Sequence, residues 1–305
     1  MKISEYIEYS AEVKQALDDG RPVVAIETAG TFEAFAYPDN KDLANLVMDR
    51  VRKEGAVPAY IAVINGKVKV GLESAEVEYL ASHKEPLVKA SRRDISILLT
   101  KQMDALTAVA ATMMVADMTG IKVVTGGGIG GVHRGAETSF DISADLEEFC
   151  KSNVVVVCSG AKSILDLKLT LEYLETHAVT IAGYRTKELP AYMAVHSGCK
   201  LDYSLDSPTE AAKCYRIKNE LGVPGGMLIA NPIDENYAVD SELMNRAVDK
   251  AVAQAAAEGI TGKVITKYIM GIVKKELGGD SKEASFHMNV DNAGLAAAIA
   301  KEIAE

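Results

Sequence analysis

Two residues stand where apolar segments of the sequence end, and both have side chains that can do chemistry. Glu27 ends the run VVAIE, and Lys162 follows the run VVVVCSGA. Burial at such a position raises the pKa of a carboxyl group and lowers the pKa of an amine. Glu27 could then act as a general acid or base, and Lys162 could form an imine with a sugar aldehyde. The alternatives are a salt-bridged glutamate at a strand end and a solvated lysine.

The residues after Lys162 strengthen this interpretation. Ser163 and Asp166 have the spacing of a capping box, which predicts a helix over residues 163–177. Lys162 is therefore expected directly before the positive end of a helix, where the pKa of an ammonium group is lowered. A neutral amine at this position would be available as a nucleophile.

The segment Gly126–Gly135 reads GGGIGGVHRG, and six of its ten residues are glycine. Glycine lets backbone N–H groups approach an anion closely, and His133 and Arg134 add side-chain donors. The segment also fits the dinucleotide pattern G-x-G-x-x-G. That pattern needs a helix directly afterwards, and the residues that follow have no helical apolar period. A phosphate-binding loop is favoured over a nicotinamide site, and a tight turn is the remaining alternative.

Two aspartates follow this loop in the stretch DISADLEEF. Ser143 is a predicted helix N-cap, and an acidic residue such as Asp145 suits the first turn of a helix. Asp141 and Asp145 would flank that helix start beside the phosphate loop. Carboxylate oxygens near a phosphate are what Mg²⁺ or Mn²⁺ prefers, with few protein ligands and several waters.

A further basic cluster is the motif KASRRD, with Lys89, Arg92 and Arg93. The sequence leaves two interpretations open. The motif is either a solvated turn or part of a site for a substrate anion.

Alternating apolar strands and amphipathic helices are expected to position these residues. The pattern predicts a three-layer α/β/α fold with a mixed, largely parallel central sheet. Asn65-Gly66 between two apolar runs predicts a β-hairpin. No linker or internal repeat divides the chain, so residues 1–305 are expected to form a single domain. The predicted strands cover residues 23–28, 59–66, 67–72, 121–125, 154–160, 179–185 and 225–232, and the predicted helices 42–55, 74–83, 104–120 and 163–177, with 240–305 mostly helical.

Composition excludes several classes of function. The chain has 33 Lys+Arg against 43 Asp+Glu, a net charge of −10, so no global field attracts nucleic acid. No apolar run is long enough to span a membrane, and the N-terminus lacks the apolar region of a signal peptide. The four cysteines are widely spaced without C-x-x-C, as in reduced, cytoplasmic proteins.

Taken together, these strings closely resemble the pseudouridine-5′-phosphate glycosidases, also called the indigoidine synthase A family. The resemblance runs from about Pro22 to Asp240 and is weaker towards the C-terminus. Its most specific part combines GGIGGVHRGAE…DISADL with GAKSILD. The other matching strings are VPAYIAVINGKVKVGL, KASRRD, TAVAATM, LDSPTE and ANPIDENYAVD.

The resemblance implies an enzyme, a C-glycosidase of the carbon–oxygen lyase class. Such an enzyme cleaves pseudouridine 5′-phosphate reversibly to uracil and ribose 5-phosphate and requires a divalent metal, typically Mn²⁺. It implies that Lys162 forms the imine, that Glu27 is the acid/base residue and that Asp141 binds the metal. It also implies a homotrimer. The substrate contacts that it implies are Lys89, Val109, Ser143, Ala144 and Asp145, with His133 and Arg134 serving the phosphate.

Three departures from the family pattern lie where the base is expected. The family's His-Gly pair reads Glu33-Ala34, Thr125-Gly126 stand in the places of Ala-Thr, and Ser285 replaces an Asn. With Phe32 and Phe35 nearby, one hypothesis is a more apolar or bulkier aglycone, and the other is neutral drift. The chain could then be a glycosidase, a C-glycoside synthase for another aglycone, or a non-enzymatic sugar-phosphate-binding regulator. In each case a small nucleotide or sugar phosphate is the expected ligand, without nucleic acid or membrane.

Overall fold

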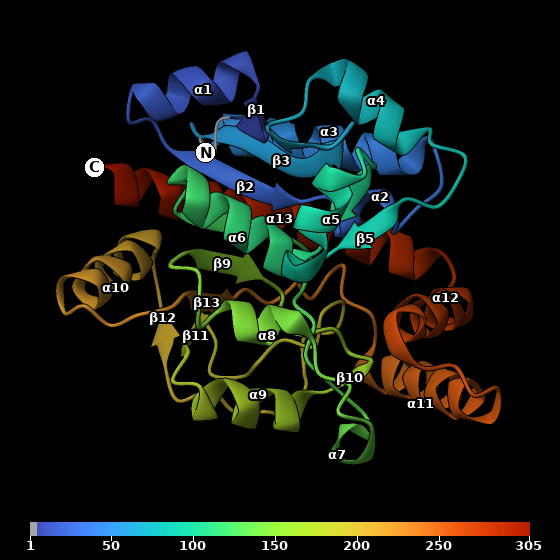
Figure 1. Ribbon diagram of the computed structural model, residues 1–305. Coiled ribbons are helices and arrows are strands. Elements are labelled where there is room, and N and C mark those ends of the chain that lie inside the picture. Colours follow the sequence, from blue (N-terminus) through green and yellow to red (C-terminus); the bar gives the residue numbers. More distant parts are fainter. Residues whose placement is uncertain (1–4) are drawn as a thin grey trace.

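Within residues 5–305, which the computed structural model describes, eleven strands form one central sheet (Figure 1). Nine of them follow the order β1-β4-β3-β2-β7-β9-β13-β11-β12, and β6 joins β3 and carries β5. Most neighbours run parallel, whereas β3 is antiparallel to β4 and to β6. The predicted mixed, largely parallel sheet is therefore confirmed. The strands are β1 (Ile7–Tyr9), β2 (Val23–Glu27), β3 (Val57–Ile64), β4 (Lys67–Val70), β5 (Val88–Ala90), β6 (Ala105–Thr107), β7 (Val123–Thr125), β9 (Val155–Cys158), β11 (Thr180–Tyr184), β12 (Ser204–Leu205) and β13 (Met227–Ala230).

Helices cover both faces of the sheet, as the alternation of buried side chains in β2 shows. Val23 and Ala25 belong to a core cluster with α1 and α6, while Val24 and Ile26 belong to a second cluster with α3 and α13. Side chains of a strand alternate between its two faces, so the sheet is the middle of three layers. The helices are α1 (Ala11–Asp18), α2 (Ala29–Phe32), α3 (Asp39–Lys53), α4 (Ser74–Ala81), α5 (Ile95–Thr100), α6 (Val109–Thr119), α7 (Ala136–Ser139), α8 (Ala144–Glu148), α9 (Leu167–Thr176), α10 (Pro208–Glu220), α11 (Ser241–Ala257), α12 (Ile265–Leu277) and α13 (Gly279–Ala304), with 3₁₀ turns η2 (Arg92–Asp94) and η3 (Gly262–Val264).

The hairpin predicted at Asn65-Gly66 joins β3 and β4. Both turn residues have positive φ, 51° and 69°, the conformation that favours Asn-Gly in two-residue hairpins. The four cysteines are free thiols in the described structure. Of the helices in residues 5–305, none combines the length and apolar character needed to cross a membrane.

Two predicted helices begin later than expected. Residues 105–107 form β6 rather than the start of a helix, because they pair with β5 and β3, and α6 begins only at Val109. Residues 165–166 form a short strand, β10 (Leu165–Asp166), which pairs with β8 (Val132–His133). The helix then starts at Leu167 with Asp166 as its N-cap. Ser163 therefore does not cap a helix, and the prediction of a helix directly after Lys162 is wrong.

The order of the strands brings the predicted catalytic residues together. β2, β7 and β9 are parallel neighbours, with Ile26 beside Thr125 and Thr125 beside Val157. Glu27 ends β2, the glycine loop follows β7, and Lys162 lies four residues after β9. Because parallel strands place their carboxyl ends at one edge of a sheet, all three features meet there.

Candidate active site

A cavity of about 400 Å³ lies at this edge of the sheet. Its walls come from β5, the glycine loop, the start of α8, the segment after β9 and the turn before α12. Charged and polar side chains dominate its lining. They include Lys89, Arg93, His133, Asp141, Asp145 and Lys162.

Lys162 is held at the cavity by the glycine loop. Its Nζ donates to the carbonyl oxygen of Gly128 at 2.7 Å, and its backbone N–H donates to Ile129 at 3.2 Å. Burial lowers the pKa of the Lys162 ammonium, and the nearby Glu27 carboxylate opposes this shift. The cause is desolvation rather than the predicted helix terminus, since the helix begins only at Leu167. The amine is favoured in its neutral, nucleophilic form.

Glu27 is 3% exposed and lies close behind Lys162. Burial raises the pKa of its carboxyl group, and the positive charges of Lys162 and Lys89 oppose the rise. The carboxylate fits between two glycines: a Cβ on Gly30 would come within 2.7 Å of Oε2, and one on Gly126 within 2.9 Å. Glu27 is therefore favoured in its protonated form, as a general acid requires.

Asp145 ties the glycine loop to the neighbouring helices. It is 6% exposed, and its Oδ1 accepts from the backbone N–H of Ala110 at 2.8 Å while Oδ2 accepts from Gly130 at 2.9 Å. Ser143 is the N-cap of α8, as predicted, and its Oγ accepts from the N–H of Asp145 at 3.2 Å. A Cβ on Gly130 would lie 2.2 Å from the Ser143 Oγ, so only glycine allows this close approach.

His133 and Asp141 form another wall. The His133 N–H donates to the carbonyl oxygen of Asp141 at 3.0 Å, and its Nε2 lies 3.3 Å from the Thr266 hydroxyl of α12. Burial lowers the pKa of the His133 ring, so its neutral form is favoured. The half-buried Asp141 carboxylate lines the cavity, and no described residue donates a hydrogen bond to it. One unengaged carboxylate suits a divalent ion that keeps most of its waters. The described residues contain no cluster of three His, Cys, Asp or Glu that could hold a metal alone.

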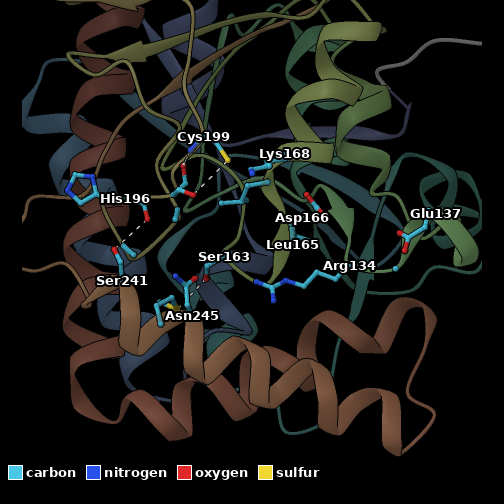
Figure 2. Close-up of a pocket in the computed structure, with 16 residues that line it drawn as sticks. Arg134, Glu137, Ser163, Leu165, Asp166, Lys168, His196, Cys199, Ser241 and Asn245 are labelled. Atoms are coloured by element: carbon cyan, nitrogen blue, oxygen red, sulfur yellow. Dashed lines mark hydrogen bonds between the residues drawn. The ribbon is translucent and has the colours of Figure 1, made fainter.

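Arg134 lies outside this cavity. Its Nη1 donates to Asp249 Oδ1 at 2.6 Å, and it lines a neighbouring cavity of about 450 Å³ together with Ser163 and Asp166 (Figure 2). Val109 is buried at the first position of α6, behind the cavity wall. Of the predicted site residues, the structure thus places seven in the cavity lining: Lys89, His133, Asp141, Ser143, Ala144, Asp145 and Lys162.

Some lining residues were not predicted as site residues. Thr266 comes from a helix that begins 132 residues after His133, and no local pattern signals the contact. Gly30, which lies against the Glu27 carboxylate outside the lining, has no sequence signal either. Arg93 was visible in the KASRRD motif, but its neighbour Arg92 carries the same signal.

Phe32 and Phe35, and the departing residue Thr125, are engaged in packing and in the sheet. The Phe32 ring contacts Tyr60 edge-on at 5.7 Å between ring centres, and Phe35 contacts Phe286 at 5.3 Å. The Thr125 hydroxyl donates to the carbonyl oxygen of Val157 at 3.0 Å, within the sheet. None of these side chains lines the cavity. The geometry therefore gives no support to the hypothesis of a bulkier aglycone.

The comparisons with known proteins identify the family of the chain. Residues 12–302 match the family model described as indigoidine synthase A like protein. The chain is 46% identical over 303 residues to a pseudouridine-5′-phosphate glycosidase of Clostridium botulinum, covering 99% of both chains. It is likewise 46% identical to the Escherichia coli K12 enzyme of that name, covering 99% of this chain and 97% of the other.

Two solved structures share the fold. The prealnumycin C-glycosynthase AlnA in complex with ribulose 5-phosphate superposes with a TM-score of 0.91 at 36% identity, covering 98% of this chain and 97% of that one. An indigoidine synthase A-like protein from Thermotoga maritima superposes with a TM-score of 0.89 at 29% identity, with the same coverage.

Proposed function

Because the chain belongs to the indigoidine synthase A-like family, we propose that it cleaves the C–C glycosidic bond of pseudouridine 5′-phosphate, releasing uracil and ribose 5-phosphate. The observation that carries the proposal is that Lys162, which lines the cavity and has a lowered pKa, lies close to the buried Glu27, whose pKa is raised. Curated relatives with 46% identity over nearly the whole chain are named for this activity.

The substrate poses a specific chemical problem. The carbon leaving group of a C-glycoside has no lone pair for a proton, so the two-carboxylate scheme of O-glycosidases is insufficient. An amine solves the problem because its lone pair can expel a carbon leaving group by forming a C=N bond. Lys162 is the amine that the cavity offers, with its Nζ held at 2.7 Å from the Gly128 carbonyl oxygen.

The proposed reaction has three steps. The Lys162 Nζ attacks C1′ of the sugar, the C1′–O4′ bond breaks, and O4′ takes the proton that the nitrogen loses. Glu27 gives its proton to C5 of uracil, the C1′–C5 bond breaks, and the nitrogen lone pair forms the iminium at C1′. Water adds to the iminium and releases ribose 5-phosphate, which frees the amine and returns a proton to Glu27. One water is consumed in each turnover, and the steps can run in reverse.

The remaining residues bind and orient the substrate in this proposal. Lys89, Val109 and the Ser143-Ala144-Asp145 stretch contact the sugar phosphate, and all of them except Val109 line the cavity. Asp141 is the residue that would hold Mn²⁺, and the bound ion would offset negative charge on the substrate. The neutral ring of His133 can donate one hydrogen bond without adding charge.

We further propose that the protein is a cytoplasmic homotrimer, as the resemblance implies. The free cysteines of the described structure support a reducing compartment. Light scattering on the purified protein would measure the assembly, and a mass three times that of one chain is expected.

The activity is tested by incubating the purified protein with pseudouridine 5′-phosphate and Mn²⁺ and following both products by mass spectrometry. Release of uracil and ribose 5-phosphate is expected, and Lys162→Ala should abolish it. Lys168→Ala is a matched control, because Lys168 is an exposed lysine six residues away. Borohydride should fix ribose 5-phosphate covalently to the wild type and not to Lys162→Ala. No product and no covalent adduct with the wild type would overturn the proposal.

A further inference from the structure

The side chain of Asn292 joins the ends of three neighbouring strands. β7, β9 and β13 lie side by side in the sheet, and the first residues after them are Gly126, Ser159 and Asn231. Asn292 belongs to α13, which lies along the sheet (Figure 1) and packs against β7 and β9. The residue is fully buried. One side chain therefore reaches all three strand ends at the edge where the active-site cavity lies.

The Asn292 amide has partners for both of its polar atoms. Its Nδ2 donates to the carbonyl oxygen of Gly126 at 3.1 Å and lies 3.1 Å from the Ser159 hydroxyl. Its Oδ1 accepts from Asn231 Nδ2 at 3.0 Å, and the Ser159 hydroxyl lies 3.3 Å from it. An amide offers two donors and an acceptor oxygen, and here the three strand ends supply the partners. A buried polar network that is satisfied in this way holds its members in one arrangement.

The first three residues of the glycine loop connect the two proposed catalytic residues. A Cβ on Gly126 would lie 2.9 Å from Oε2 of Glu27, so this glycine lies directly against the carboxylate. The carbonyl oxygen of Gly128 accepts from Lys162 Nζ at 2.7 Å. This short segment determines how the acid and the amine are placed relative to each other, and Asn292 holds its first residue.

The far half of the glycine loop is anchored independently. The N–H of Gly130 donates to Asp145 Oδ2 at 2.9 Å, and the N–H of Val132 donates to the Thr170 hydroxyl at 3.0 Å. Gly130 and Asp145 line the cavity, whereas Asn292 does not. Loss of the Asn292 amide should therefore displace the part of the loop that holds the reacting groups and leave the cavity wall in place.

We propose that Asn292 is a positioning residue, which fixes the glycine loop to the ends of β9 and β13 and so places Lys162 and Glu27 for reaction. The inference deepens the proposed function and rests on it, because that function makes these two residues the reacting groups. Asn292 lies outside the cavity lining and acts through the backbone of the loop. Its loss should lower the rate of reaction more than the affinity for substrate.

The test uses Asn292→Leu, which keeps the approximate volume of the side chain and removes the amide. The kcat for pseudouridine 5′-phosphate should fall about 10- to 100-fold, because a misplacement of about 1 Å can cost about 100-fold in rate. KM should stay within about threefold of the wild type, since the cavity wall keeps its own anchors. The Ser159 N–H donates to the Gly127 carbonyl oxygen at 3.0 Å, and its hydrogen exchange should become faster while that of Val132 stays unchanged.

Tyr215→Phe is the matched control for the loss of a buried hydrogen bond. Tyr215 is 3% exposed, and its hydroxyl donates to the carbonyl oxygen of Asn153 at 2.9 Å, at the opposite edge of the sheet. This variant should lower the melting temperature and keep the wild-type kcat. Should Asn292→Leu fail to fold, Ser159→Ala takes its place, because it removes one partner of the amide without adding bulk. Its kcat should fall about 3- to 10-fold.

The inference is overturned if Asn292→Leu keeps the wild-type kcat, if KM rises as much as kcat falls, if the Ser159 N–H exchanges as in the wild type, or if Tyr215→Phe loses as much activity. Imine formation gives a readout that does not need cleavage. Borohydride should fix ribose 5-phosphate to Lys162 about 10-fold more slowly in Asn292→Leu than in the wild type. A wild type that forms this adduct at a rate dependent on Asn292, without cleaving pseudouridine 5′-phosphate, would refute the proposed function alone.

Discussion

Gly30 offers a way to move the proposed general acid without touching it. Gly30 lies in the short helix α2, directly after the strand that ends at Glu27. Replacing it by alanine would put a Cβ 2.7 Å from Oε2 of Glu27, whereas ordinary contact begins at 3.4 Å. The carboxylate must therefore retreat by about 0.7 Å. Because the clashing atom is the end of a side chain, the carboxylate should move and the backbone should stay.

The catalytic loss follows from that displacement. A misplacement of about 1 Å can cost about 100-fold in rate, so Gly30→Ala should lower kcat about 10- to 100-fold. Stability should hardly change, because alanine favours a helix by up to about 1 kcal/mol over glycine and offsets the local strain. The melting temperature should stay within about 3 °C of the wild type.

The assay follows uracil release at saturating pseudouridine 5′-phosphate, alongside thermal melting. Gly271→Ala is the matched control, since Gly271 lies within α12 and a Cβ there meets nothing within 4 Å. That variant should keep the wild-type kcat and be slightly more stable. Gly126→Ala, with its Cβ 2.9 Å from the same oxygen, should behave like Gly30→Ala. A Gly30→Ala enzyme with wild-type kcat would refute the assignment of Glu27 as the acid at this position, and loss of both kcat and fold would refute the claim that only the side chain yields.

Three more predictions concern stability. Because burial raises the pKa of Glu27, the stability that its protonated form contributes is present below pH 4.5 and is lost as pH rises through the pKa of the folded state. Glu27→Gln should therefore raise the free energy of unfolding by about 1 kcal/mol at pH 9 and by much less at pH 4.5. Equal gains at the two pH values in thermal melting would contradict it. Asp145→Ala leaves two backbone N–H groups without their acceptor and should cost about 2–5 kcal/mol in urea unfolding, and a cost under about 1 kcal/mol would show that water replaces the carboxylate. Arg92→Leu leaves the buried Glu148 carboxylate without its ion-pair partner and should lower the free energy of unfolding by about 3–5 kcal/mol. Arg246→Leu should lower it by under about 0.5 kcal/mol, and similar losses for the two variants would rule out a special role of the buried pair.

The sheet and its catalytic edge could be predicted because their signals are local. Runs of β-branched residues mark β2, β7 and β9, and Asn65-Gly66 has few conformations other than a hairpin turn. Glu27 and Lys162 were recognisable because Glu27 ends such a run and Lys162 follows another one closely. Parallel strands then bring residues 135 positions apart to the same edge.

The errors come from segments whose local signal is ambiguous. Residues 104–108 are apolar enough for a buried helix or a buried strand, and pairing with β3 and β5 decides for the strand. After Lys162, Ser163 and Asp166 both suit an N-cap, and pairing of Leu165 with His133 selects Asp166. In both cases hydrogen bonds to a distant strand determine where the helix begins, and a short window of sequence does not show these bonds.

The two arginines of KASRRD show the same limit within the site. Arg92 and Arg93 are adjacent and chemically identical. The sequence therefore does not show which of them forms an ion pair within the protein and which lines the cavity. The deciding partner is Glu148, which lies 56 residues away in sequence and fixes one arginine only. Similarly, Thr266 reaches His133 across 133 residues.

The shared burial of Glu27 and Lys162 explains how one site can hold both an acid and an amine. Burial is the largest cause of both pKa shifts, and the attraction between the two charges opposes each shift without being the larger effect. Both shifts thus favour the neutral form of each group. In the proposed bond cleavage Lys162 becomes an iminium cation as Glu27 becomes a carboxylate, so the attraction appears only when the C–C bond breaks. An interaction that is stronger in the transition state than in the ground state is the kind that accelerates a reaction.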